Sequence, residues 1–344
     1  FTAVYVIIGG YMATAINDFI QGIIMLVGII AVIYTVLSKN GGFMQSLALM
    51  SEIESPVMNG AYTSFFGPDP FYLLIVVLLT SLGTWGLPQM VGKFYAIKNE
   101  HSIKRGTMIS TLFAIVVAGG CYFLGGFARL FNSVEQVREN GFDSIVPSML
   151  SGLGDMLIAV VLILVLSASM STLSSLVLAS SSTLTLDFIN PLRKKRLQDS
   201  QNLFVMRLFI AVFIVISAVI AIVQAKSKVT FIAQLMGISW GALSGSFFAP
   251  FFYGLYWKKV SKASVISSFC FGCSIMIVQL FVSIGFIDFS GSFFNFVFRN
   301  SLYSGVFCML SSLIIVPVVS LLTPKTCPAN VEEMFAGYNA THMV

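Results

Sequence analysis

Long apolar runs separated by short polar segments dominate this chain. Each run holds about 20 mostly apolar residues or more, enough to cross a bilayer as a helix. Lipid offers the backbone no hydrogen-bond partners, so the runs are predicted to be helices and the chain an all-α polytopic membrane protein. After a stub at residues 1–8, the eight runs lie near residues 12–38, 71–95, 106–130, 153–188, 204–225, 229–257, 262–287 and 300–323.

Basic residues mark one side of the predicted membrane. They gather in three connecting segments, at residues 93–105, 193–196 and 258–262. Short loops rich in Lys and Arg stay in the cytoplasm. The basic-poor segments that alternate with them are then outer loops, at residues 39–70, 131–145 and 288–299, with Lys226 and Lys228 as the exception. The first of these is predicted to be irregular, with at most a short surface helix.

Composition agrees with a lipid environment. Hydrophobic residues make up 57% of the chain and charged residues 10%, whereas soluble domains carry about 25% charged residues. The net charge of +5 comes from short clusters with no continuous basic face, so no nucleic acid partner is predicted. We expect a multi-pass protein of a cell membrane, the inner membrane of a bacterium, with the lipid bilayer as its partner.

The organisation along the chain is simple. Residues 1–324 are predicted to form one transmembrane domain, and the polar residues 325–344 a loose cytoplasmic tail. The chain starts without Met inside an uncharged run, which we interpret as an N-terminal truncation. The pair Cys270 and Cys273 lies in an apolar span with no histidine nearby and is interpreted as packing thiols, so no transition-metal site is predicted.

Asp18 stands out because it lies between two long uncharged runs. An ionisable residue inside a span costs about 3 kcal/mol or more and is a functional candidate by default. On these grounds alone, Asp18 could equally cap a helix near the cytoplasmic surface.

A stripe of hydroxyl groups runs along residues 167–185. Ala168, Ser171, Thr172 and Ser175 share one helical face, since their spacing is i, i+3, i+4 and i+7. Hydroxyl and carbonyl oxygens suit a small hard cation, and no Cys or His shares the face. The alternative is close helix packing, in which Ser and Thr are common in membranes. The small residues of Gly237–Gly245 are read as such packing.

Residues Ser81–Gln89 form a breakable helix in mid-span. Pro88 lacks a backbone N–H and clashes with the preceding turn, and Gly83 and Gly86 add flexibility. Transporters place substrates and ions at such discontinuous helices. A structural kink without any ligand is the alternative.

Three stretches together resemble the sodium:solute symporter family, whose members carry proline, pantothenate, sialic acid and glucose. Gly9-Gly10 through Asn17-Asp18-Phe-Ile-Gln21 is similar to the family's Gly-Gly…Thr-Asp-x-x-Gln signature, with Asn17 in place of Thr. Met170-Ser-Thr-Leu-Ser-Ser175 is similar to its sodium-site helix, and Trp240-Gly-Ala-Leu-Ser-Gly through Pro250 to a further family stretch. The resemblance covers nearly the whole chain.

The resemblance implies a partial leucine-transporter-like fold of two inverted five-helix repeats. Residues 12–38 correspond to the fifth core helix, residues 71–257 to the second repeat, and the last two helices are peripheral. The first four core helices are missing from the sequence. We therefore expect that this fragment alone does not transport.

The resemblance also implies one or two bound sodium ions as the only cofactor. The first would lie at the Ala168 carbonyl and the hydroxyls of Ser171 and Thr172, with partner carbonyls upstream of Phe1. A second site, present in sialic acid carriers, would use Asp18, Ser171, Ser174 and Ser175. The substrate-binding residues would be Ser81, Thr84, Trp85 and Gln89.

The implied function is sodium-coupled symport of a small organic solute by alternating access. Sugar carriers of the family use a charged residue within the seventh core helix, to which residues 107–128 correspond by resemblance, and the absence of charge there favours an amino acid or carboxylate over a sugar. A solute sensor of the same fold is the main alternative. We expect no enzyme, because no cluster of catalytic side chains lies inside the spans, and no channel, because no filter repeat or charge ring is present.

Overall fold

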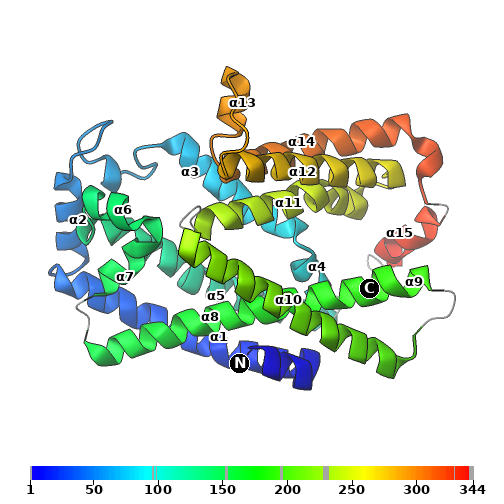
Figure 1. The fold of residues 1–344 in the computed structure, drawn as a ribbon, viewed down its shortest axis with the longest axis horizontal. Helices are drawn as coiled ribbons and strands as arrows, with labels where there is room; N and C mark the ends of the chain where they lie inside the picture. The colour runs from blue at the N-terminus through cyan, green and yellow to red at the C-terminus, as the bar shows by residue number, and fades with distance from the viewer. Residues whose placement is uncertain are drawn as a thin grey trace. The chain divides into compact units, whose positions relative to one another are not determined.

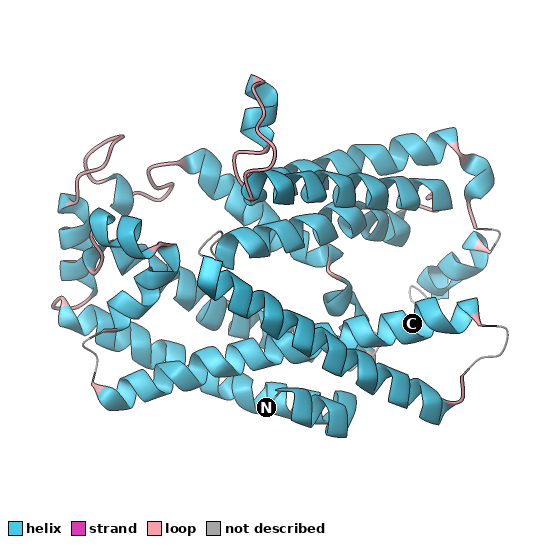
Figure 2. Ribbon diagram, viewed as in Figure 1, coloured by secondary structure: helices cyan, strands magenta, loops and turns pink. Residues whose placement is uncertain are grey.

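The computed structural model describes residues 2–94, 97, 99–151, 154–193, 197–227, 232–328 and 330–340. Every element in this described part of the chain is a helix (Figure 2). Seven helices are long and apolar enough to cross a membrane, and a bent pair, Pro70–Gly86 with Pro88–Phe94, makes an eighth. The predicted all-α polytopic architecture is thus confirmed. Phe1, Lys194, Lys195, Arg196, Lys228 and Thr341, which entered the sequence predictions, lie outside the described residues.

The contacts divide the chain into two compact units. Unit 1 comprises residues 1–68 and 96–228, and unit 2 comprises residues 69–95 and 229–344. The helices of unit 1 are α1 (Thr2–Lys39), α2 (Phe43–Glu52), η1 (Ala61–Thr63), α5 (Glu100–Gly126), η4 (Phe127–Leu130), α6 (Val134–Asn140), η5 (Phe142–Ser144), α7 (Ile145–Leu150), α8 (Asp155–Ser182), η6 (Thr183–Ile189), α9 (Asn190–Leu192) and α10 (Asp199–Ser227) (Figure 1).

Helix α1 joins the predicted stub and the first predicted span into one element. Its course bends at Gly10, which has φ 57° and ψ −146° inside an otherwise helical segment. This backbone conformation is essentially restricted to glycine. Thr14 Oγ1 donates a hydrogen bond to the Gly10 carbonyl at 2.9 Å, so the turn after the bend is closed. The sequence pattern predicted residues 1–8 and 12–38 as separate elements, with the break near this glycine.

Two apolar clusters hold unit 1 together. The first packs Ile29 and Val36 of α1 against Leu124 of α5, Met149 of α7 and Val161 of α8. The second packs Val6 of α1 against Val177 of α8 and Ile210 of α10. Helix α1 therefore runs along α8 for most of its length, with packed contacts at both ends of the crossing.

The helices of unit 2 pack around α11. They are α3 (Pro70–Val77), η2 (Leu78–Leu82), η3 (Gly83–Gly86), α4 (Pro88–Phe94), α11 (Ile232–Tyr256), α12 (Lys262–Ser283), α13 (Ser292–Val297), α14 (Ser301–Leu322), η7 (Pro324–Thr326) and α15 (Val331–Ala340) (Figure 1).

Glycines let α11 approach α14 closely. A Cβ atom placed on Gly241 would lie 2.7 Å from the Gly305 Cα, and one on Gly245 would lie 2.5 Å from the Cys308 Cβ. The Gly237–Gly245 stretch therefore forms a tight helix contact, as the sequence predicts for small residues at this spacing.

The C-terminal segment differs from the loose tail that the sequence predicts. Residues 331–340 form helix α15. Glu332 accepts a salt bridge from Lys258 at the end of α11 at 2.7 Å, and the Lys258 ammonium lies 5.8 Å from the Phe335 ring centroid. One ion pair and one ring contact thus hold α15 against the unit, which polar composition alone does not reveal.

Candidate functional site

The candidate cation site lies where α1 crosses α8. Gly28 of α1 faces Leu164 of α8, because a Cβ on that glycine would lie 2.8 Å from the Leu164 Cδ1. At the other end, the Tyr5 hydroxyl donates to the Met170 carbonyl at 3.2 Å. These contacts show that α1 and α8 run along each other in opposite directions, with Asp18 between Tyr5 and Gly28 on α1 and Ser171 next to Met170 on α8.

Helix α8 buries a row of serines on the face that packs in unit 1. Ser167, Ser174 and Ser181 are each seven residues apart and 6%, 0% and 0% exposed. Ser171 and Ser175 are partly buried beside them. On α1, Asp18 is partly buried as well, with its Oδ1 atom closed off from solvent. The four residues of the predicted second sodium site therefore all lie on two helices that pack against each other, α1 and α8.

The hydroxyl groups of this site donate into their own helix. Ser174 Oγ donates to the Ser171 carbonyl at 2.9 Å, and Thr172 Oγ1 donates to the Ala168 carbonyl at 3.0 Å. A hydroxyl that has placed its hydrogen in this way keeps its lone pairs for another partner. The carbonyl keeps a second lone pair too. All these atoms are oxygens, which is the ligand type that hard cations prefer.

The two predicted sodium sites differ in how far this chain encloses them. Ala168 is only partly buried and Thr172 is exposed, whereas Ser174 is fully buried. The predicted first site thus opens to the surface of the described chain. The predicted second site lies inside the α1–α8 contact.

Sequence reasoning gave no role to two neighbours of Asp18. Gln21 is 5% exposed, and its Oε1 atom is buried without a hydrogen-bond partner in the described part of the chain. The Nδ2 atom of Asn17 is in the same situation. The two amides are four residues apart and so lie on one face of α1. Asn17 and Gln21 lie on either side of the intramembrane Asp18 in the sequence, four residues apart. This pattern could have been recognised from the sequence alone.

The predicted substrate stretch is a break in a helix of unit 2. The chain leaves α3 through a π turn and a 3₁₀ turn, then bends by 51° into α4 at Pro88. Gly83 and Gly86 are buried against α11, where a Cβ on Gly86 would lie 2.7 Å from the Phe248 backbone nitrogen. The prediction of a discontinuous helix is confirmed.

The side chains chosen as substrate-binding residues lie mostly away from α11. Ser81 and Trp85 are exposed, and Thr84 and Gln89 are partly buried. Thr84 Oγ1 donates to the Ser81 carbonyl at 2.8 Å. The one buried hydroxyl without a partner here is that of Ser244 on α11, within the described residues. It faces Gly83, since a Cβ on that glycine would lie 3.3 Å from the Ser244 Cβ. Sequence reasoning missed it.

Comparisons with known proteins agree on what this chain resembles. The model of the sodium:solute symporter family matches residues 1–272. Sodium/proline symporters from Staphylococcus aureus, including that of strain JH9, are 29% identical over 280 residues, which is 80% of this chain and 53% of theirs. The chain therefore spans about half the length of these curated relatives.

A solved structure shares the fold. The substrate-bound outward-open state of a Na⁺-coupled sialic acid symporter, described as revealing a novel Na⁺ site, matches with a TM-score of 0.63 at 17% identity. The match covers 93% of this chain and 64% of that one. It confirms the predicted leucine-transporter-like fold class, and the family match confirms a multi-pass protein of the cell membrane that is not an enzyme. By its matched sequence, this chain belongs to the sodium:solute symporter family.

Proposed function

We propose that this chain supplies the sodium-binding helices of a secondary transporter that imports a small organic solute together with sodium. The observation that carries the proposal is the packing of α1, which bears the partly buried Asp18, against α8, which bears the buried row of serines. A carboxylate together with hydroxyl and carbonyl oxygens inside a membrane suits Na⁺, which enters here as a transported co-substrate.

Two sodium ions fit the available ligands. One is held by Asp18 with Ser171, Ser174 and Ser175 inside the crossing. The other is held by the Ala168 carbonyl with Ser171 and Thr172 on the open side of α8. Ser171 belongs to both sets, so occupancy of one site influences the other through this residue.

The solute binds at the broken helix, with Ser81, Thr84, Trp85 and Gln89 as its ligands. The relatives that carry proline and sialic acid support a small organic solute with a carboxylate. The lack of any charged side chain in residues 107–128 of α5 supports an amino acid or carboxylate over a sugar.

Coupling needs no covalent chemistry. Sodium and solute favour the same conformer, by a typical coupling free energy of about 1–3 kcal/mol. Sodium entry then drives accumulation, because each charge that moves inward gains about 2.3 kcal/mol per 100 mV of membrane potential. Alternating access of the helices around the midplane completes the cycle.

Uptake into proteoliposomes tests the proposal. The full-length protein, in the longest form that its gene encodes, is reconstituted and given labelled proline, pantothenate, sialic acid, monocarboxylates and sugars, with an inward gradient of sodium or potassium. We expect one carboxylate-bearing compound to accumulate only with sodium. Asp18→Asn and Ser174→Ala should abolish that accumulation.

A matched control variant distinguishes an effect on the sodium site from a general effect of removing a serine hydroxyl. Ser267 on α12 donates to the Ala263 carbonyl at 2.9 Å, as the site serines donate along α8, but it lies in the other unit. Ser267→Ala should leave sodium dependence unchanged. Equal uptake in potassium would overturn sodium coupling. Saturable binding of a solute without accumulation would favour a sensor of the same fold instead.

A further inference from the structure

A pocket of about 620 Å³ lies at one end of unit 1, away from the predicted sodium site. Its walls come from the end of α5, from η4, α6 and η5, and from the start of α7. This is the end that the charge pattern predicts to face outward, because it carries the segment 131–145. The lining residues are Gly125, Ala128, Arg129, Asn132, Ser133, Val137, Arg138, Gly141, Phe142 and Ile145.

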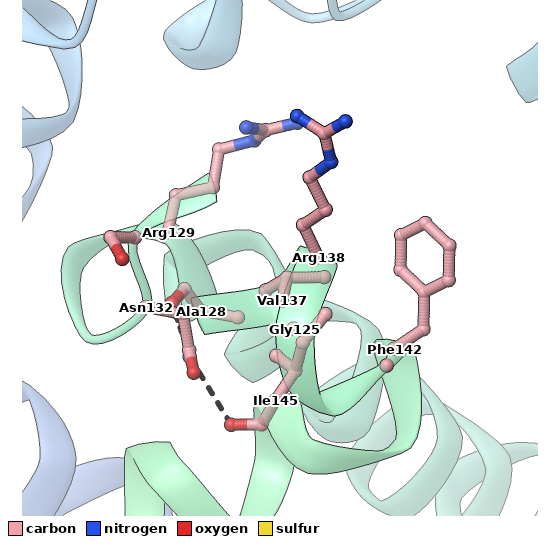
Figure 3. Close-up of a pocket in the computed structure, with 10 residues that line it drawn as sticks. Gly125, Ala128, Arg129, Asn132, Val137, Arg138, Phe142 and Ile145 are labelled. Carbon is pink, nitrogen blue, oxygen red and sulfur yellow. Dashed lines mark hydrogen bonds between the residues drawn. The ribbon is translucent and has the colours of Figure 1, made fainter. Parts of the chain in front are cut away.

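Two arginines converge on this pocket. Figure 3 shows the side chains of Arg129, from η4, and Arg138, from α6, reaching toward each other across its opening. Two guanidinium groups carry like charges and repel each other. In the described part of the chain, neither arginine makes an ion pair with a carboxylate.

The acidic groups of the same segment lie outside the pocket. Glu135 and Glu139 of α6 and Asp143 of η5 are exposed, and none of them lines it. Arg129 and Arg138 are exposed as well, but they line the pocket, whereas these carboxylates do not. A cavity with two cations and no anion is complementary to a negatively charged ligand.

Packed aromatic side chains hold Arg129 in place. Arg129 stacks on the ring of Tyr62, with its Cζ atom 4.2 Å from the ring centroid. Behind it, Phe127 is buried and packs on Phe123 with ring centroids 5.2 Å apart. The stacked face of Arg129 is occupied, so the edge that carries its N–H donors is left for a ligand.

The helix that carries Arg138 is fixed at its start. Ser133 and Gln136 form a reciprocal capping box, with hydrogen bonds of 3.2 and 3.1 Å. Just before it, the Asn132 amide donates to the carbonyls of Ala128 at 2.9 Å and Ile145 at 3.2 Å, which ties η4 to α7 (Figure 3). Asn132 Oδ1 is buried without a partner within the described residues.

We propose that the Arg129–Arg138 pocket binds an oxyanion, either a carboxylate or a phosphate group, on the outer face of the protein. The guanidinium fork pairs two parallel N–H donors with two oxygens of such a group. Val137, Phe142 and Ile145 supply an apolar wall beside it, so the pocket accepts a ligand with an apolar body as well as a charge. The chemistry fits a free organic acid or phosphate and equally the headgroup of an anionic lipid.

Anion titrations test whether the pocket binds a free organic acid or phosphate. Inorganic phosphate or acetate is titrated calorimetrically into the full-length protein in a maltoside detergent, at constant sodium and ionic strength. We expect saturable binding that is weaker by about tenfold or more in the double variant Arg129→Gln/Arg138→Gln, because each guanidinium contributes charge-assisted hydrogen bonds. The variant Arg129→Lys/Arg138→Lys keeps both charges without the forks and should bind with intermediate affinity.

Lipid retention tests the second source. The protein is placed in nanodiscs of phosphatidylcholine with or without phosphatidylglycerol and examined by native mass spectrometry. Retention of phosphatidylglycerol that the double Gln variant loses, without binding of phosphate or acetate, would assign the pocket to a lipid phosphate. Either pattern supports an oxyanion site.

The control is Arg105→Gln, which removes an exposed arginine from the other end of α5. It should bind both probes as the unchanged protein does. The proposal is overturned if the double Gln variant, with an unchanged thermal midpoint, binds phosphate, acetate and lipid as the unchanged protein does. It is overturned equally if Arg105→Gln weakens binding as much, since the effect would then be net charge alone. Should the double variant fail to fold, the single variants Arg129→Gln and Arg138→Gln carry the same test.

Discussion

Both units contain helix contacts rich in small polar residues, but the two units differ in whether the buried polar groups at these contacts have hydrogen-bond partners. In unit 2, the buried serines of α12 and α14 find partners. Ser320 Oγ donates to Ser264 Oγ at 2.8 Å, Ser268 Oγ donates to the Ser246 carbonyl at 3.0 Å, and Ser304 Oγ donates to Gln279 Oε1 at 2.7 Å. A buried polar group that is fully paired stabilises packing and needs no ligand.

In unit 1, several buried polar atoms on α1 and just after the end of α8 have no hydrogen-bond partner within the described residues. Gln21 Oε1 and Asn17 Nδ2 are buried without partners in the described residues, and so is Thr185 Oγ1, which follows the serine row. In unit 2, the comparable orphan is Ser244, beside the broken helix. Within the described residues, the α1–α8 contact therefore differs from the packing of α12 with α14 in its unpaired buried polar groups and not in its serine content.

The largest effect is expected in unit 2, where a side chain on α11 would meet the backbone of α14. Gly241→Val should destabilise the full-length protein by about 3 kcal/mol, because its side chain would meet the Gly305 backbone and overpacking of this kind costs about 1–3 kcal/mol or more. Reversible unfolding in mixed micelles with dodecyl sulfate measures the free energy.

The counterpart in unit 1 is Gly22 on α1, near the predicted sodium site. A Cβ there would lie 3.5 Å from the Phe113 ring, an ordinary contact. Gly22→Ala should therefore leave the free energy of unfolding unchanged or raise it by up to about 1 kcal/mol. A loss in Gly22→Ala as large as that in Gly241→Val would show that the two contacts are packed alike.

Two buried glutamines sharpen the comparison. Gln279 of α12 is 1% exposed, accepts from Ser304 and donates to Ser283 at 3.1 Å. Gln279→Leu should cost about 1–3 kcal/mol in unfolding free energy, because it strips buried partners of their hydrogen bonds. Sodium dependence of uptake should not change.

Gln21→Leu should change the sodium dependence of uptake and have little effect on the free energy of unfolding. It removes an oxygen that has no hydrogen-bond partner among the described residues, so stability should fall by less than about 1 kcal/mol. If Gln21 Oε1 helps to hold the cation, the sodium concentration for half-maximal uptake should rise about tenfold. An unchanged sodium requirement would assign Gln21 to packing and weaken the contrast between the units.

The bend in α1 tests the backbone of the same helix. Gly10→Ala should cost about 1–3 kcal/mol, since an L-residue at φ 57° and ψ −146° is strained. The control Gly125→Ala lies on α5 in an ordinary helical segment where a Cβ would meet nothing within 4 Å. Equal midpoints of thermal unfolding in the two variants would mean that the bend at Gly10 is not kept in the membrane.

The sequence predicted the spans and the broken helix because each depends on local chemistry. Lipid forces apolar runs into helices, and Pro88 prevents a regular turn wherever it lies. The four residues of the predicted second sodium site were brought together only through family resemblance, since Asp18 and Ser174 are far apart in the chain. Gln21, Ser244 and the Arg129–Arg138 pocket were missed, because an unpaired atom or a convergence of charges is a property of the folded arrangement.

The smallest effect is expected at the salt bridge that holds α15. Lys258→Ala should lower the free energy of unfolding by less than about 1 kcal/mol, because the side chains of Lys258 and Glu332 are 46% and 85% exposed and solvent screens the pair. High salt should have the same small effect on the unchanged protein and none on the variant. The local test is limited proteolysis at residues 331–340, which should become faster in Lys258→Ala while the rest of unit 2 stays protected. Unchanged proteolysis would mean that the bilayer or contacts other than those of Lys258 hold this helix in place.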